Sequence, residues 1–232
     1  MRFLCLVLGD TRFQFRYGFY LLYAFLTLVY LLVLSLVPVE SKAVVATILI
    51  FSDPAAMGLF FMGAIVLLEK SQRVQASLAV SPVKLWEYIL SKGISLSVIG
   101  CIVSLVLACM AGMSDLFLLS VGVFASSMLF SCCGLFTAMR TDTLNGFMLA
   151  SVPFEILIFI PAMLNLFGMV RSPWTLLHPG VAAIALIGGL DDTGLILSCI
   201  LSLAAWNILA FLLCRRSVED GFARIGGEGG RL

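Results

Sequence analysis

Ionisable residues are scarce in this chain of 232 residues. Only 12% of the residues are Asp, Glu, Lys or Arg and one is histidine, whereas 62% are hydrophobic. With a mean hydropathy of +1.14, too little polar surface remains to cover a water-soluble globule, so the sequence predicts an integral membrane protein. The formal net charge of +1 gives no indication of nucleic-acid binding, and we expect none.

Several motifs that would mark a catalytic site are also missing. A single histidine, His178, cannot supply a histidine cluster around a metal or a catalytic triad built on several histidines. The seven cysteines lie in apolar runs without C-x-x-C spacing, which is typical of packing residues. No G-x-x-x-x-G-K-[ST] segment is present, so the chain alone cannot cradle the phosphates of ATP. We therefore expect no catalytic residue, metal or cofactor in this chain.

Six apolar stretches are long enough to cross a bilayer. A helix needs about 20 mainly apolar residues to cross roughly 30 Å of hydrocarbon, because each residue rises about 1.5 Å. The predicted spans are residues 18–37, 43–68, 89–112, 116–139, 146–168 and 194–214. A shorter seventh stretch is interrupted by His178-Pro179-Gly180, so we expect a re-entrant or interfacial hairpin on the outer side, at residues 173–190.

The basic residues are divided unequally between the two sides that six spans define. Twelve of the 14 Lys and Arg residues fall on the side that carries both termini, and only Lys42 and Arg171 fall on the other. Since basic residues accumulate on the cytoplasmic side, we expect both termini in the cytoplasm. The chain then divides into an N-terminal interfacial helix (1–17), an all-α six-span domain (18–214) and a cytoplasmic tail (215–232).

The most informative segment is the predicted cytoplasmic loop between the second and third spans. Val74 and Leu78 lie one helical turn apart beside charged residues, which indicates a short amphipathic helix. Ser81-Pro82 then ends this helix and starts another, because proline suits the first helical position and disfavours a helical residue before it. This shape suits the transmission of force from a soluble partner. A solvated loop with ordinary anchors is the alternative.

The loop resembles that of type-2 ATP-binding-cassette (ABC) exporter permeases, and small fluoroquinolone- or drug-export permeases in particular. The residues that carry the resemblance are Glu69, Lys70, Leu78, Ser81, Pro82, Tyr88 and Lys92. The resemblance extends to the six-span layout and implies a coupling segment at residues 69–88. This segment would dock on a separate ATPase subunit through Glu69, Lys70, Arg73, Val74, Leu78, Ser81 and Pro82.

The same resemblance implies an assembly and an activity. ATPase subunits that bind ATP and Mg would move two permease subunits, identical or different, between inward- and outward-facing states. The transporter would lie in the cytoplasmic membrane of a bacterium. Its expected cargo is an amphipathic drug, peptide or lipid-like molecule that leaves the cytoplasm.

Two acidic residues, Asp53 and Glu155, lie inside predicted spans. Ionisable groups in a membrane are costly and usually face protein or water, so both are candidates for a substrate path. They leave open a second function, a secondary transporter coupled to protons or cations. For Glu155 a place in a subunit interface is an alternative, and an intramembrane enzyme or a non-transporting scaffold is a further alternative for the whole chain.

Small residues recur along the second and fourth predicted spans. Glycine and serine allow close approach of helices in a membrane, where packing drives helix association. We expect close helix contacts at Gly58, Gly63, Ser126, Ser127, Ser131 and Gly134.

Overall fold

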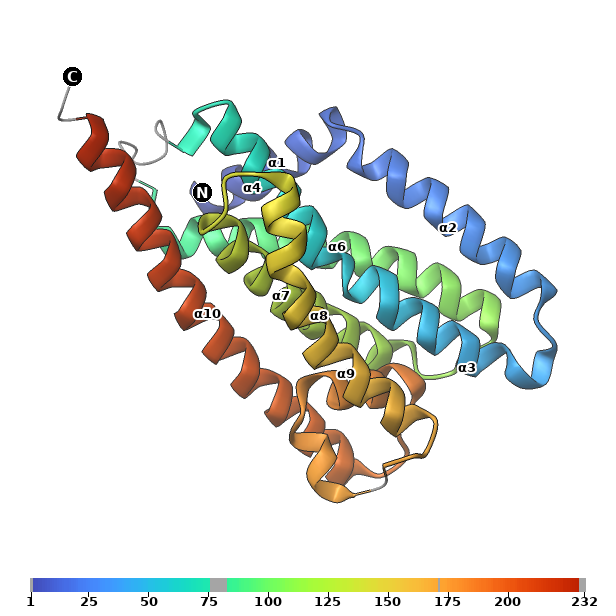
Figure 1. Cartoon of the computed structure of the whole chain (residues 1–232). Helices are drawn as coiled ribbons and strands as arrows, with labels where there is room; N and C mark the ends of the chain where they lie inside the picture. Colours follow the sequence, from blue (N-terminus) through green and yellow to red (C-terminus); the bar gives the residue numbers. More distant parts are fainter. Residues whose placement is uncertain (1, 76–82, 171, 230–232) are drawn as a thin grey trace.

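The computed structural model describes residues 2–75, 83–170 and 172–229. These residues contain no strand, and their long helices lie side by side in one bundle (Figure 1). Six helical segments are long and apolar enough to cross a membrane, and they are Phe19–Leu36, Val39–Ser71, Leu85–Ala111, Leu116–Met139, Leu144–Leu166 and Thr193–Phe222. Each overlaps one predicted span. The prediction of an all-α membrane protein with six spans is therefore confirmed.

The chain begins with two helices, α1 (Arg2–Arg16) and α2 (Phe19–Leu36). They are joined at Gly18, whose φ of 78° lies in the left-handed region that glycine adopts without strain. Helix α1 turns Asp10 and Gln14 toward the protein. Its outer face carries the exposed apolar side chains Leu4, Leu8 and Phe15. This arrangement suits a helix that lies against lipid, although its place at the membrane interface stays a prediction.

The second span is built from three pieces, α3 (Val39–Ile50), the π-helical turn η1 (Phe51–Ala55) and α4 (Met57–Ser71). Proline at position 54 has no N–H to donate, and the wider π-helical turn accommodates this gap in the helical hydrogen bonding. The turn places the Asp53 side chain inside the protein.

The next two spans are α6 (Leu85–Ala111) and α7 (Leu116–Met139). Helix α6 begins later than the Ser81-Pro82 step predicts: its N-cap is Lys84 and its first residue is Leu85. The Lys84 backbone N–H donates to Glu87 Oε2 at 2.9 Å, so the side chain in the first turn fixes where the helix starts.

Helices α4 and α7 approach each other closely at small residues. A Cβ atom on Gly134 would lie 2.3 Å from the carbonyl oxygen of Leu59, and one on Gly58 would lie 2.8 Å from the carbonyl oxygen of Ser127. A Cβ atom on Gly63 would collide with the ring of Phe147, so this glycine marks a close contact of α4 with a third helix, Leu144–Leu166. The predicted close contacts are therefore confirmed for these glycines, because no larger side chain fits between the helices.

The last elements are α8 (Leu144–Leu166), the 3-10 turn η2 (Pro173–Leu177), α9 (Pro179–Gly188) and α10 (Thr193–Gly229). Figure 1 shows η2 and α9 at the end of the bundle opposite the chain termini. Helix α9 lies within the predicted hairpin and is buried along most of its length. Its re-entrant or interfacial place in the membrane stays a prediction. Helix α10 continues past the last span, so the described part of the predicted tail is helical.

Candidate coupling site

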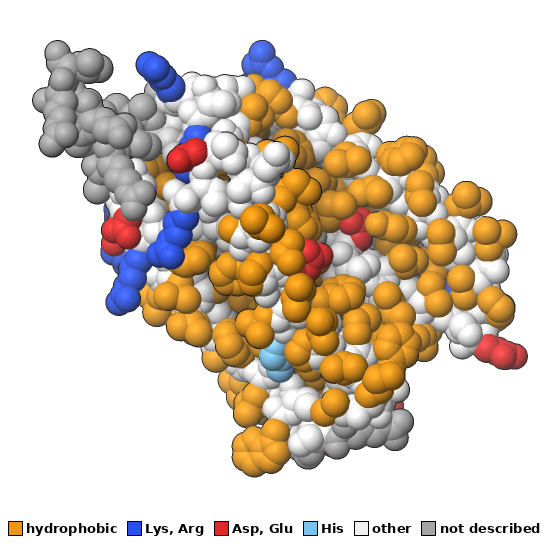
Figure 2. All heavy atoms as spheres, viewed as in Figure 1, with side chains coloured by type: hydrophobic (Ala, Val, Ile, Leu, Met, Phe, Trp, Pro, Cys, Tyr) orange, Lys and Arg blue, Asp and Glu red, His pale blue; other side chains and the backbone are white. Residues whose placement is uncertain are grey.

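The structure describes four of the seven residues predicted to contact an ATPase subunit. They lie at the end of α4 and in the turn after it, and they are Glu69, Lys70, Arg73 and Val74. The other three, Leu78, Ser81 and Pro82, lie outside the described residues. Figure 2 shows that most lysine and arginine side chains on this face gather at the end of the molecule that carries the chain termini.

Glu69 points into the protein and is only 5% exposed. Its carboxylate forms an ion pair with Lys92 and accepts a hydrogen bond from the Tyr88 hydroxyl at 2.8 Å. The Lys92 ammonium also pairs with Asp10 Oδ1 at 2.8 Å, and the Ser91 hydroxyl donates to Asp10 Oδ2 at 2.6 Å. This coupling network of Asp10, Glu69, Tyr88, Ser91 and Lys92 joins α1, α4 and α6.

The coupling network surrounds one positive charge, the ammonium group of Lys92. Lys92 is 2% exposed, and the removal of an ion from water is costly unless close partners and further hydrogen bonds offset it. Two carboxylates supply the partners, and the Tyr88 ring lies 4.9 Å from the ammonium nitrogen. Both carboxylate oxygens of Glu69 are directed at residues of α6, one at Lys92 and one at Tyr88, so in this structure Glu69 positions helices. A direct contact of Glu69 with an ATPase stays a prediction.

Sequence reasoning identified three members of the network, Glu69, Tyr88 and Lys92, but missed Asp10 and Ser91. Asp10 and Gln14 are one helical turn apart in α1, and the Gln14 amide donates to the Ser95 hydroxyl of α6 at 2.7 Å. The available signal was these two polar side chains on one face of an otherwise apolar and basic helix. That signal indicates a polar face of α1 but does not name the helix that it meets.

Lys70 connects the coupling segment to the turn between α7 and α8. Its ammonium group donates to the carbonyl oxygens of Met139 at 3.2 Å and Thr141 at 2.9 Å, and it lies 3.5 Å from Asp142 Oδ1. The last carbonyl groups of a helix lack intrahelical partners and carry partial negative charge. Lys70 therefore stabilises the C-terminal end of α7 from a neighbouring helix.

Arg73 is exposed and has a φ of 57°, the only positive φ among the described residues other than glycine. Its backbone N–H donates to the Lys70 carbonyl at 3.1 Å, in the position after a helix end where glycine is usual. A non-glycine residue in this conformation costs about 1–3 kcal/mol. Such strain marks Arg73 as a candidate for function, and Val74, which is half-buried, follows it directly.

The two acidic residues of the spans lie on different helices, Asp53 in η1 and Glu155 in α8. Asp53 is 6% exposed and interacts with the hydroxyls of Tyr23 and Tyr30 on α2. Glu155 is partly exposed. Figure 2 shows acidic atoms among the apolar side chains in the middle of the molecule. Whether either residue lines a substrate path stays a prediction.

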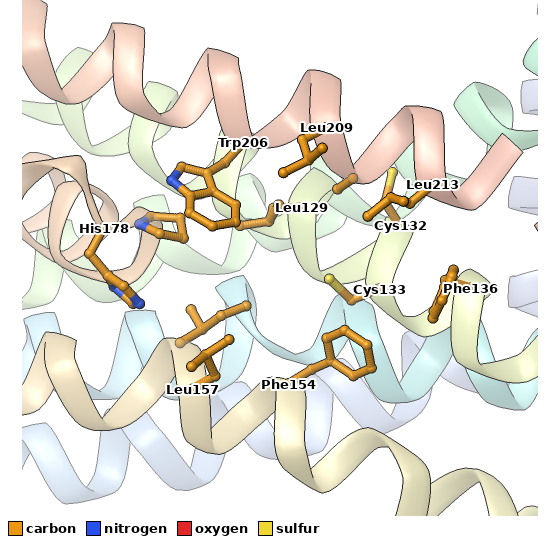
Figure 3. A pocket seen from close by; sticks show the side chains of 13 residues that line it. Leu129, Cys132, Cys133, Phe136, Phe154, Leu157, His178, Trp206, Leu209 and Leu213 are labelled. Atoms are coloured by element: carbon orange, nitrogen blue, oxygen red, sulfur yellow. The ribbon is translucent and has the colours of Figure 1, made fainter. Parts of the chain in front are cut away.

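An apolar cavity of about 170 Å³ lies between α7, α8 and α10. Figure 3 shows His178 at one end of it, with Trp206 of α10 nearby. The His178 ring interacts with the backbone of Leu157, whose carbonyl lacks its usual helical donor because Pro161 has no N–H. Burial lowers the pKa of His178 below its ordinary value, and the interaction with Leu157 partly opposes this shift. The ring is therefore neutral at pH 7.

The chain is similar to known proteins over most of its length. The model of the Fluoroquinolones export permease protein family matches residues 2–215. The chain belongs to this family. Fluoroquinolones export permease proteins from two strains of Mycobacterium tuberculosis are 26% identical to it over 197 residues, which cover 84% of this chain and 80% of each relative.

The match begins in α1 and ends in α10, so it includes five candidate spans in full, the sixth as far as residue 215, and the coupling segment. Family membership and the six apolar helices together confirm the predicted class, a multi-pass membrane permease. The permease family also supports the prediction of a transport subunit over that of an intramembrane enzyme.

Proposed function

We propose that this permease is the membrane subunit of an ATP-driven ABC exporter. It moves an amphipathic drug, peptide or lipid-like substrate out of the cytoplasm by alternating access. Separate ATPase subunits hydrolyse ATP, and a second permease subunit, identical or different, completes the transporter. The names of the relatives make fluoroquinolones the first substrates to test.

The observation that carries the proposal is the buried coupling network. The loop between α4 and α6 is flanked by Glu69 and Lys92, and these two residues pair with each other inside the protein. Asp10 of α1 binds the same lysine. A force applied to the loop is therefore passed to three helices as one body, because packed interiors resist continuous deformation. Rigid-body movement of this kind is what alternating access needs.

Lys70 and Arg73 support the same proposal. Lys70 extends the connection from the loop to the turn between α7 and α8 through two backbone carbonyls. Arg73 is exposed beyond these buried contacts, at the start of the segment that would face the ATPase. In this arrangement the coupling network and Lys70 would transmit movement, and the exposed Arg73 would contact the ATPase.

A charge reversal at Arg73 tests the docking part of the proposal. Tagged permease purified from its native membrane should carry an ATPase subunit with it, and Arg73→Glu should lower the recovered ATPase about tenfold or more. Arg216→Glu is the matched control, because Arg216 is also an exposed arginine at the basic end of the molecule. Equal recovery with both variants, or no ATPase with the unaltered permease, would contradict docking at this segment.

A proton- or cation-coupled secondary transporter is the second candidate function. The observation that favours it is Asp53, which is buried without a basic partner among the described residues. Inside-out vesicles separate the two functions. Fluoroquinolone uptake that requires ATP and survives collapse of the proton gradient supports the exporter, whereas uptake that survives ATP depletion and stops when the gradient collapses establishes the secondary transporter.

A further inference from the structure

The break in the second span brings three polar side chains together between η1 and α2. Asp53 of η1 is 6% exposed and Tyr23 of α2 is 2% exposed. The Asp53 carboxyl group interacts electrostatically with both Tyr23 and Tyr30. The two tyrosines are two helical turns apart, so they lie on one face of α2. This cluster of Asp53, Tyr23 and Tyr30 is called the carboxyl–tyrosine cluster below.

Two atoms of the carboxyl–tyrosine cluster are buried and have no hydrogen-bond partner among the described residues. They are Asp53 Oδ2 and the Tyr23 hydroxyl oxygen. Native proteins rarely leave buried polar atoms unpaired, and an unpaired carboxylate inside a membrane is the most costly case. The cluster therefore has unused capacity for a ligand that brings hydrogen-bond donors.

No basic side chain of the described residues pairs with Asp53. None of the ion pairs of the described residues includes Asp53. Lys42 precedes it by 11 positions, which is about 16 Å along a helix, and Lys92 is held by its two carboxylates in the coupling network. Within the part of the chain that the structure describes, no positive charge neutralises an ionised Asp53.

The surroundings favour an organic ammonium group over a metal ion. The Tyr23 ring packs edge-on against Phe61 at 4.8 Å, and Phe61 packs against Phe19 at 5.1 Å. Aromatic rings beside a carboxylate attract alkylammonium groups, because ring faces and carboxylate are both negative. Metal ions of the hard type usually need about six oxygen ligands, and three side chains cannot supply them. An ammonium group can instead donate to the carboxylate and to both hydroxyls.

Helix α2 has few buried residues and a largely apolar outer surface. Only two of its 18 residues, Tyr23 and Leu34, are buried. Most of its surface consists of exposed apolar side chains, which suit either lipid or the apolar body of a substrate. Asp53 therefore lies behind a helix whose outer surface is apolar.

We propose that the carboxyl–tyrosine cluster binds the ammonium group of the transported substrate, so that the substrates are amphipathic amines. The proposal rests on the proposed export function, whose substrate class it specifies. Asp53 supplies the charge, Tyr23 and Tyr30 supply hydrogen-bond acceptors and ring faces, and the exposed face of α2 receives the apolar part of the substrate.

Binding to purified permease without any ATPase tests the site directly. The probes are ciprofloxacin, which carries a basic piperazine amine, and N-acetylciprofloxacin, in which that amine is blocked, and their fluorescence anisotropy reports binding. We expect the permease to bind the amine at least tenfold more tightly than the acetylated probe. Asp53→Asn should reduce the affinity for the amine to that for the acetylated probe and leave the latter unchanged, which also shows that the variant is folded.

Two further variants sharpen the result. Tyr30→Phe should weaken binding of the amine severalfold, and Glu155→Gln, which alters the other acidic residue of the spans, should leave the preference intact. Equal affinity for the two probes, or a preference that survives Asp53→Asn, would overturn the assignment.

Export with the ATPase present distinguishes this inference from the proposed function. ATP-dependent export of both probes at the same rate would contradict the amine-binding site and would still support the exporter function. Export of neither probe would contradict the exporter, while the binding measurements on the permease alone would still decide the site.

Discussion

Lys92 and Asp10 are 82 residues apart in the sequence, yet the lysine Nζ lies 2.8 Å from the aspartate Oδ1. The same ammonium group pairs with Glu69 at the end of α4. One buried lysine thus holds α1, α4 and α6 together beside the segment that we propose as the ATPase contact.

Replacement of Lys92 by methionine should lower the free energy of unfolding by about 3–5 kcal/mol, because Asp10 and Glu69 would then stay buried without a cation. Unfolding of the purified permease in detergent measures this loss. The control combines Lys92→Met with Asp10→Asn and Glu69→Gln, which removes both unpaired charges. The triple variant should recover most of the loss, and a triple variant no more stable than Lys92→Met would show that buried charge is not the cause.

Replacement of Lys70 by methionine should lower the free energy of unfolding by about 1–2 kcal/mol, since two carbonyls at the end of α7 lose a charged donor. We place the value below that of a fully buried bond because the lysine side chain is 22% exposed. Asp142→Asn is the control, as the Asp142 side chain is 96% exposed and lies 3.5 Å from the lysine. A thermal shift with Asp142→Asn as large as that with Lys70→Met would assign the effect to the ion pair instead.

Gly134→Ala should destabilise the bundle by about 1–3 kcal/mol, because the added methyl group would collide with the Leu59 backbone and force α4 away from α7. The matched control is Gly9→Ala in α1, where a Cβ meets nothing within 4 Å. This control should be neutral or more stable by up to about 1 kcal/mol, since alanine favours a helix over glycine. Similar melting temperatures for the two variants would rule out a tight contact at Gly134.

His178 should make stability depend on pH. Its pKa is lowered in the folded protein from an ordinary value of 6.5, chiefly by burial. The unfolded chain therefore takes up a proton at higher pH than the folded protein, and the associated stability is present above about pH 6.5 and is lost as the pH falls through and below it. Melting temperatures measured from pH 7.5 to pH 5 should fall more steeply for the unaltered permease than for His178→Gln, and parallel curves would refute this.

Features that depend on local chain properties were predictable. The six spans follow from the length of apolar runs, and Gly134 and Gly58 follow from the need for small residues where helices touch. The start of α6 at Leu85 was not predicted, because Glu87 caps the helix and outweighs the Ser81-Pro82 signal. Asp10 was missed because its partner is far away in the sequence.

The sequence by itself determined that this protein is a six-span helical membrane protein with a charged segment between its second and third spans, because both properties are set by composition along the chain. Only the tertiary structure decided that Glu69 and Asp10 share Lys92, and that Asp53 faces Tyr23. Spans that are apolar on every face leave the rotation of each helix unspecified, so the partner of each polar side chain is chosen when the helices pack.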